Sequence, residues 1–121
     1  MSLFDKLLVA HLVGDLLLQT EWMAVNKKTN YRALLSHVGV YSLVILFVLI
    51  FEFGFQDIYV YLTVGIIALS HAFLDRSWPV VYFMKSFRLV VDREPDRLLR
   101  IAVDQVFHIL LLAIATVILL R

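Results

Sequence analysis

The chain has 121 residues, of which 62% are hydrophobic and 17% charged, with a formal net charge of +1 and a mean hydropathy of +0.89. This composition excludes an ordinary soluble domain, in which charged residues make up about a quarter of the chain, and predicts one integral membrane domain over residues 1–121. The absence of cysteine excludes disulfides and thiolate metal ligands, and the near-neutral charge gives no reason to expect a nucleic-acid partner.

Four long apolar segments are expected to span the bilayer as helices, over about residues 3–23, 31–53, 58–75 and 98–120. A spanning helix needs about 20 mainly apolar residues, and helices that are apolar on every side are typical of contact with lipid. The first segment is the least regular, because Asp5 and Lys6 stand at its start. A signal peptide is its alternative interpretation, which the lack of a small-residue cleavage site disfavours. The predicted fold is therefore an all-α, four-helix membrane bundle.

A shorter helix is expected between the third and fourth spans, over about residues 79–91. Ser77 and Pro79 suit a helix start, and apolar residues then recur at helical spacing while Lys85 and Arg88 fall on another face. This pattern predicts a short amphipathic helix. Two placements remain open, one flat on the cytoplasmic surface of the bilayer and one packed over the end of the bundle.

The connections between the spans differ in charge. The second connection, residues 52–57, has two acids and no cation, whereas the first and third carry nine basic residues: Lys27, Lys28, Arg32, Arg76, Lys85, Arg88, Arg93, Arg97 and Arg100. Because Lys and Arg are enriched in cytoplasmic connections, we expect the first and third connections in the cytoplasm and both termini outside, in a bacterial inner membrane.

Ionisable residues inside the apolar segments follow a regular spacing. All four histidines lie in these segments, and three of them are four residues from an aspartate: His11 with Asp15, His71 with Asp75, and Asp104 with His108. Spacing of four places each pair on one helix face. The last pair is written in reverse order, and its helix is expected to run in the opposite direction. All three aspartates should therefore lie about 6 Å closer to the cytoplasm than their histidines, with His37 at a similar depth.

Carboxylates at this depth need a positive partner, because each costs about 2.5–3.5 kcal/mol at the centre of a membrane helix. No Lys or Arg is expected at the same depth. Imidazole and carboxylate together suit zinc, with manganese or iron as alternatives. We therefore predict one or two divalent metal ions; one ion would leave some carboxylates to orient its imidazoles. The predicted ligands are His11, Asp15, His37, His71, Asp75, Asp104 and His108. The alternative is that these side chains only form hydrogen bonds between helices.

Other polar residues stand near the predicted ligands. Gln19, Tyr41 and Gln105 are expected to support the site, or to form hydrogen bonds between helices or, for Tyr41, to lie beside lipid. Basic residues near the cytoplasmic side are candidates for contact with a lipid or phosphate head group, although retention of topology also explains them. These are Arg76, Lys85, Arg88 and Arg100.

The motifs resemble an uncharacterised bacterial and phage membrane-protein family catalogued as a domain of unknown function. The resemblance covers essentially the whole chain and is carried by His-Leu-x-Gly-Asp-x-x-Leu-Gln from His11, by a histidine in the second span, by His-x-x-x-Asp from His71, and by Asp-Gln-x-x-His from Asp104. It implies that Gly14, Gln19 and Gln105 belong to the family pattern together with the predicted ligands. It implies no activity.

Three functions remain open from the sequence. The first is a metal-dependent hydrolase that acts on a lipid or phosphate ester, with Asp75 or Asp104 as general base. The second is a proton or metal-ion transporter, which is disfavoured because no span has a broken-helix pattern and no ionisable residue continues the path beyond His11 and His108. The third is a metal-stabilised membrane subunit that recruits a partner. So short a chain would need a homo-oligomer to form a pore.

Overall fold

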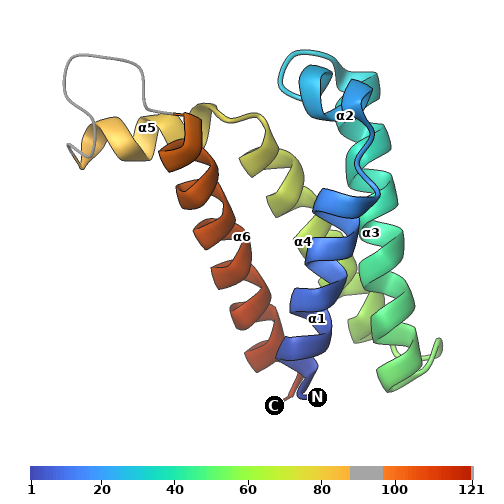
Figure 1. Ribbon diagram of the computed structural model, residues 1–121. Helices are drawn as coiled ribbons and strands as arrows, with labels where there is room; N and C mark the ends of the chain where they lie inside the picture. Colours follow the sequence, from blue (N-terminus) through green and yellow to red (C-terminus); the bar gives the residue numbers. More distant parts are fainter. Residues whose placement is uncertain (88–96, 121) are drawn as a thin grey trace.

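A computed structural model describes residues 1–87 and 97–120, and this part of the chain is entirely helical (Figure 1). Its elements, in chain order, are α1 (Leu3–Leu12), the π-helical turn η1 (Val13–Leu17), α2 (Glu21–Asn26), α3 (Tyr31–Phe53), α4 (Ile58–Asp75), α5 (Trp78–Ser86) and α6 (Arg97–Leu119).

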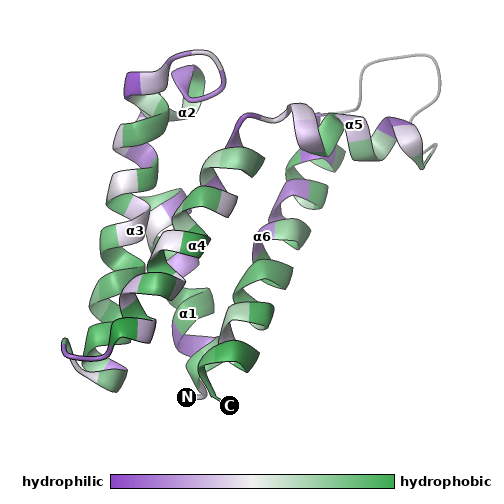
Figure 2. Cartoon of the chain, turned by 180° about the vertical axis from the view of Figure 1, so that it is seen from behind, coloured by the Kyte–Doolittle hydropathy of each residue, from purple (hydrophilic) through white to green (hydrophobic). Residues whose placement is uncertain are grey.

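Three of the helices, α3, α4 and α6, are long and apolar enough to cross a membrane. They correspond to the segments predicted at 31–53, 58–75 and 98–120. Apolar residues cover most of their length (Figure 2), and many of these residues are exposed. Exposed leucine, isoleucine and phenylalanine in such numbers fit lipid as the surrounding solvent, so the chain has the character of a membrane protein.

The segment at 3–23, expected as the first span, is not one continuous helix. A capping box begins α1, in which the Ser2 hydroxyl accepts from the Asp5 amide and the Asp5 carboxylate accepts from the Ser2 amide. The π turn η1 then ends at Leu17, and Thr20 starts α2 by accepting a hydrogen bond from the Met23 amide. A threonine that caps a new helix competes with continuation of the preceding helix. The neighbouring residues are mainly apolar, so the hydropathy of the segment does not indicate this break.

The long helices form a bundle in which α1 packs against α3 and α6, and α4 also packs against both α3 and α6. Both ends of the described chain lie at one end of this bundle, and α2 and α5 lie at the other (Figure 1). The end near the termini is filled by an apolar core that includes Leu7, Ile45, Leu49, Val60 and Leu112. The polar residues described below occupy the other half.

The predicted amphipathic helix is present as α5, and it lies across the end of α6 at a steep angle to the bundle (Figure 1). Val80 and Met84 are buried and pack in a cluster with Phe107 of α6, while Trp78 and Tyr82 are exposed. Pro79 stands in its first turn, where its missing N–H costs nothing. The end of the predicted range, residues 88–91, lies outside the described residues.

Candidate metal centre

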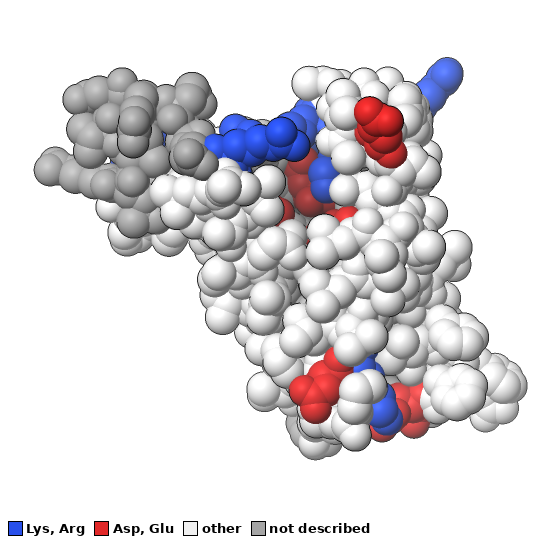
Figure 3. Space-filling view, in the orientation of Figure 1, with Lys and Arg blue, Asp and Glu red and all other residues white. Residues whose placement is uncertain are grey.

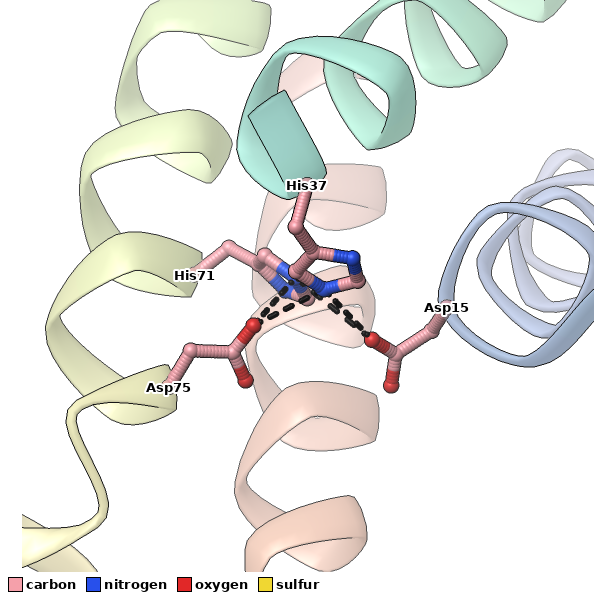
Figure 4. Close-up of side chains that lie close together, drawn as sticks. All are labelled: Asp15, His37, His71 and Asp75. Atoms are coloured by element: carbon pink, nitrogen blue, oxygen red, sulfur yellow. Dashed lines mark hydrogen bonds and ion pairs between the residues drawn. The ribbon is translucent and has the colours of Figure 1, made fainter. Parts of the chain in front are cut away.

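Four buried side chains from three elements converge at the middle of the bundle (Figure 4). They are Asp15 from η1, His37 from α3, and His71 and Asp75 from α4. The His37 Nε2 atom lies 3.0 Å from Asp15 Oδ1 and 2.9 Å from Asp75 Oδ2. The His71 Nε2 atom lies 3.0 Å from the same Asp75 oxygen and 3.6 Å from Asp15 Oδ1. We call this set the four-donor group.

The spacing of these donor atoms fits a coordination shell. The two ring nitrogens, His37 Nε2 and His71 Nε2, are only 2.9 Å apart. Bonds of about 2.1 Å to a shared metal place neighbouring donor atoms about 3.0 Å apart in octahedral and about 3.4 Å apart in tetrahedral geometry. The observed separations of 2.9–3.6 Å fall around these values, so the four-donor group can hold one ion without rearrangement of the helices.

Hydrogen bonding alone satisfies the four-donor group poorly. If both Nε2 atoms carry protons, two N–H groups face each other at 2.9 Å. If either lacks its proton, its lone pair faces the ionised Asp75 carboxylate at 2.9–3.0 Å. Each arrangement of neutral rings therefore leaves a repulsive contact inside a buried site. A shared cation removes all of these repulsions together.

Asp75 also belongs to a second group, with Asp104 and His108 of α6, in which one donor atom of each residue lies within 4.8 Å of the others. The Nδ1 atom of His108 lies 2.8 Å from the backbone carbonyl of Asp104, so this nitrogen is the one that donates. The other ring nitrogen, Nε2, has no hydrogen-bond partner among the described residues and lies 3.6 Å from Asp75 Oδ1. We call this set the three-donor group.

His11, which was predicted as a ligand, lies beside both groups but belongs to neither. Its Nδ1 atom is 2.9 Å from the Tyr41 hydroxyl and its Nε2 atom is 2.9 Å from Gln105 Oε1. A carbonyl oxygen only accepts, so Nε2 donates to Gln105 and Nδ1 accepts from Tyr41. Both ring nitrogens are thereby occupied, and His11 acts in this structure as a hydrogen-bonding residue.

Gln105 connects this network to the carboxylates. Its side-chain amide nitrogen donates to Asp15 Oδ2 over 3.1 Å and to Asp104 Oδ2 over 3.4 Å, while its oxygen accepts from His11. One amide therefore fixes two predicted ligands from different helices. Tyr41 and Gln105 thus both contact predicted ligands, and their supporting role stays a prediction.

Tyr41 is held between η1 and α4. Its ring stacks on the imidazole of His71, with centroids 3.9 Å apart and planes 5° apart. On its other side the chain approaches at Gly14, where an added Cβ atom would lie 3.0 Å from Tyr41 Cδ2 and 3.3 Å from Tyr41 Cα. An alanine at this contact would force Tyr41 or the η1 backbone to shift by a few tenths of an ångström.

A pocket of about 220 Å³ opens over the centre at the end of the bundle that carries α2. Its lining includes the three predicted carboxylates Asp15, Asp75 and Asp104, and Gln19, whose buried Oε1 atom has no hydrogen-bond partner among the described residues. Basic residues complete the rim, so blue and red atoms adjoin in the hollow seen in Figure 3. They are Lys27, Lys28, Arg97 and Arg100.

Lys27 is a partner that the sequence analysis missed. Its Nζ atom lies 3.3 Å from Asp75 Oδ2, contrary to the expectation that no cation reaches the depth of the aspartates. The chain turns back after η1 and α2, which brings Lys27 over the pocket. The Lys27 ammonium group balances the charge of one of the three predicted carboxylates. Further positive charge is still needed to balance the other two.

The predicted head-group residues are separated by the structure. Arg100 lines the pocket, whereas Arg76 does not and places its guanidinium 4.9 Å above the ring of Tyr31. Lys85 lies on α5 and does not line the pocket either, and Arg88 lies outside the described residues. The pocket is lined instead by three basic residues that were not predicted as head-group contacts: Lys27, Lys28 and Arg97.

Comparison with known proteins gives a family and no function. No curated protein and no solved structure matches the chain. The model of a family described as "Protein of unknown function (DUF3307)" matches residues 3–121. Because the match covers nearly the whole sequence, the chain belongs to this DUF3307 family of unknown function.

Proposed function

We propose that the protein is a membrane-embedded, metal-dependent hydrolase of a lipid or phosphate ester. The observation that carries the proposal is the convergence of His37 Nε2, His71 Nε2 and two carboxylate oxygens in a buried site. Each of the two nitrogens lies 2.9–3.6 Å from both oxygens and 2.9 Å from the other nitrogen. Zinc is the proposed ion, with manganese and iron as alternatives, because nitrogen and oxygen donors suit all three.

The proposed membrane arrangement has four spans, with α1 and η1 together forming the first. This pair covers residues 3–17, about 22 Å at 1.5 Å per residue, which is short for a bilayer of about 30 Å. In this proposal, the segment between η1 and α2 supplies the remaining length of the first span. The end with α2, α5 and the basic residues is placed in the cytoplasm, so the pocket opens toward that side.

The roles proposed for Asp75 and Asp104 follow from the contacts that each carboxylate already makes with other side chains. A bound metal would polarise an ester oxygen and lower the pKa of a bound water molecule to near neutrality. Asp75 contacts two imidazoles and Lys27, which makes it a ligand. Asp104 is 22% exposed toward the pocket, and its Oδ2 atom has longer contacts, 3.4 Å to the Gln105 amide nitrogen and 3.6 Å to His108 Nδ1. Asp104 is therefore the better placed of the two predicted carboxylates to accept a proton from water.

A phosphate group is the proposed substrate feature, because four basic residues surround the mouth of the pocket. The pKa of Lys28 lies below its ordinary value, first because burial disfavours its charge and then because Arg100, Lys27 and Arg97 repel it. A bound anion would reduce the electrostatic repulsion between these neighbouring cations. A phospholipid or an isoprenoid phosphate would bring that anion to the pocket from the bilayer.

Transport is the weaker candidate. A path across the membrane would have to continue from the histidines toward the end with the termini. That half of the bundle is instead filled by Leu7, Ile45, Leu49, Val60 and Leu112, all at most 1% exposed. Among the described residues this apolar layer offers no site for an ion or a proton.

The test uses the full chain, purified without chelators and placed in lipid nanodiscs with added Zn²⁺ or Mn²⁺. Bis-p-nitrophenyl phosphate, p-nitrophenyl phosphate and p-nitrophenyl butyrate distinguish phosphodiesterase, phosphomonoesterase and esterase activity. We expect metal-dependent release of p-nitrophenol that is lost in His37→Gln and retained in Arg32→Gln. Metal-independent turnover overturns the metal mechanism, whereas metal flux into proteoliposomes without any turnover supports the transporter. Bound metal with neither activity supports the structural subunit.

A further inference from the structure

The two donor groups share one residue, Asp75, and its two oxygen atoms face different partners. Asp75 Oδ2 lies 2.9–3.0 Å from the imidazoles of His37 and His71, whereas Oδ1 lies 3.6 Å from His108 Nε2. A carboxylate placed in this way can bridge two metal ions about 3.5–4 Å apart. We propose that the centre is dinuclear, with the first ion in the four-donor group and the second in the three-donor group. This inference rests on the metal site proposed above.

His108 supplies independent support for the second position. The residue is 3% exposed, and its Nε2 atom has no hydrogen-bond partner among the described residues. The hydrogen bond from Nδ1 to the Asp104 carbonyl leaves the lone pair on Nε2, which faces Asp75 Oδ1. A hydrogen bond from the ring nitrogen that does not bind the metal is the usual way in which a metal-binding histidine is oriented.

The two positions differ in their access to the pocket. The four-donor group reaches the pocket through Asp15, whose side chain is 4% exposed, and its His37 and His71 are fully buried. Asp104 of the three-donor group is 22% exposed and lines the pocket together with Asp75. Three protein donors leave coordination positions for water and substrate, as in catalytic metal sites. The second ion is therefore the one that meets substrate. One oxygen of Asp104 binds this ion, and its other oxygen accepts the proton from the attacking water.

A dinuclear centre also agrees with the basic rim. Two divalent ions outweigh the charges of Asp15, Asp75 and Asp104, so the loaded centre is positive. An anionic phosphate that bridges the ions and contacts Lys28 or Arg100 would balance this charge. The same two-ion geometry stabilises both the attacking and the leaving oxygen during displacement at phosphorus.

The experiment counts ions with Mn²⁺ as the probe. The full chain in nanodiscs is loaded with Mn²⁺, desalted, and analysed for Mn²⁺ per chain by mass spectrometry and for exchange coupling by electron paramagnetic resonance. We expect two equivalents and a coupled spectrum for the wild type. His108→Gln and Asp104→Asn should each retain one equivalent with an uncoupled six-line spectrum. Thr116→Val is the matched control, since Thr116 is a buried polar residue of the same helix, α6, and lies outside both groups; it should retain two.

The outcomes separate this inference from the proposed function. One equivalent in the wild type and one in His108→Gln overturns the dinuclear centre and leaves the metal site intact. No bound metal in the wild type overturns both proposals. A His108→Gln protein that binds no ion, yet matches the wild type in size-exclusion elution and circular dichroism, shows that the positions are not separable and also overturns the inference.

Discussion

The Nε2 atoms of His37 and His71 lie 2.9 Å apart in the middle of the bundle, although the two residues come from different helices. Both nitrogens also face carboxylate oxygens of Asp15 and Asp75. Packing of α3 against α4 alone does not explain why two imidazoles and two carboxylates should meet edge to edge. The shared metal ion proposed above would explain it.

Removal of the metal should destabilise the protein. A ligand present at 100 times its dissociation constant stabilises the folded state by about 2.7 kcal/mol, and the buried carboxylates would repel one another without it. We expect chelation to lower the midpoint of thermal unfolding, measured by circular dichroism in detergent. His37→Gln, which lacks a ligand of the four-donor group, should show a smaller change on chelation than the wild type. An unchanged midpoint for the wild type would contradict a bound structural ion.

Gly14→Ala should destabilise the bundle, because its Cβ atom would lie 3.0 Å from the Tyr41 ring and 3.3 Å from the Tyr41 backbone. Overpacking of this kind costs about 1–3 kcal/mol. Gly39→Ala is the control, since nothing lies within 4 Å of a Cβ atom at that position and alanine favours a helix. Denaturant unfolding in micelles should show a loss for Gly14→Ala and none for Gly39→Ala; equal stabilities would disprove the close contact.

Tyr41→Phe should have a small effect that separates hydrogen bonding from metal binding. The substitution removes the hydroxyl that contacts His11 Nδ1 but keeps the ring stacked on His71. Hydrogen bonds between membrane helices contribute about 0.6 kcal/mol on average. We expect a loss of stability of about that size with unchanged metal content. Tyr82→Phe, at an exposed position, serves as the control, and loss of metal from Tyr41→Phe would show that Tyr41 has a larger role.

Lys28→Gln and Arg100→Gln should weaken the binding of inorganic phosphate to the metal-loaded protein. Each removes one cation from the pocket rim, and a contact between a cation and phosphate worth about 1.4 kcal/mol corresponds to a tenfold change in affinity. Isothermal titration calorimetry should detect the loss. Arg32→Gln removes an equally basic residue that does not line the pocket and should leave phosphate affinity unchanged. If all three variants bind phosphate alike, the rim does not recognise the anion.

The three long helices and the pairing of histidine with aspartate were predictable from the sequence. Long apolar runs determine where a helix can cross a membrane, and spacing of four places His71 and Asp75 on one face whatever their neighbours. The structure accordingly brings Asp15, Asp75 and Asp104 to one pocket and places His37 beside His71.

Other features depended on contacts that helix periodicity does not specify. The break at Thr20 comes from a local cap within a segment whose hydropathy favours a continuous helix. Only this turn brings Lys27 back to Asp75. His11 has the same spacing to its aspartate as His71, but the hydroxyl of Tyr41 and the amide of Gln105 meet both of its nitrogens. Spacing therefore predicted which residues gather, and packing decided which of them can bind an ion.

The most direct test is an anomalous difference map from crystals of the protein grown without chelators, collected at the absorption edge of the metal found by X-ray fluorescence. The account predicts a peak about 2.1 Å from the Nε2 atoms of both His37 and His71 and from an oxygen of Asp75. A map without a peak there, from crystals in which the two nitrogens still lie 2.9 Å apart, would contradict the metal centre.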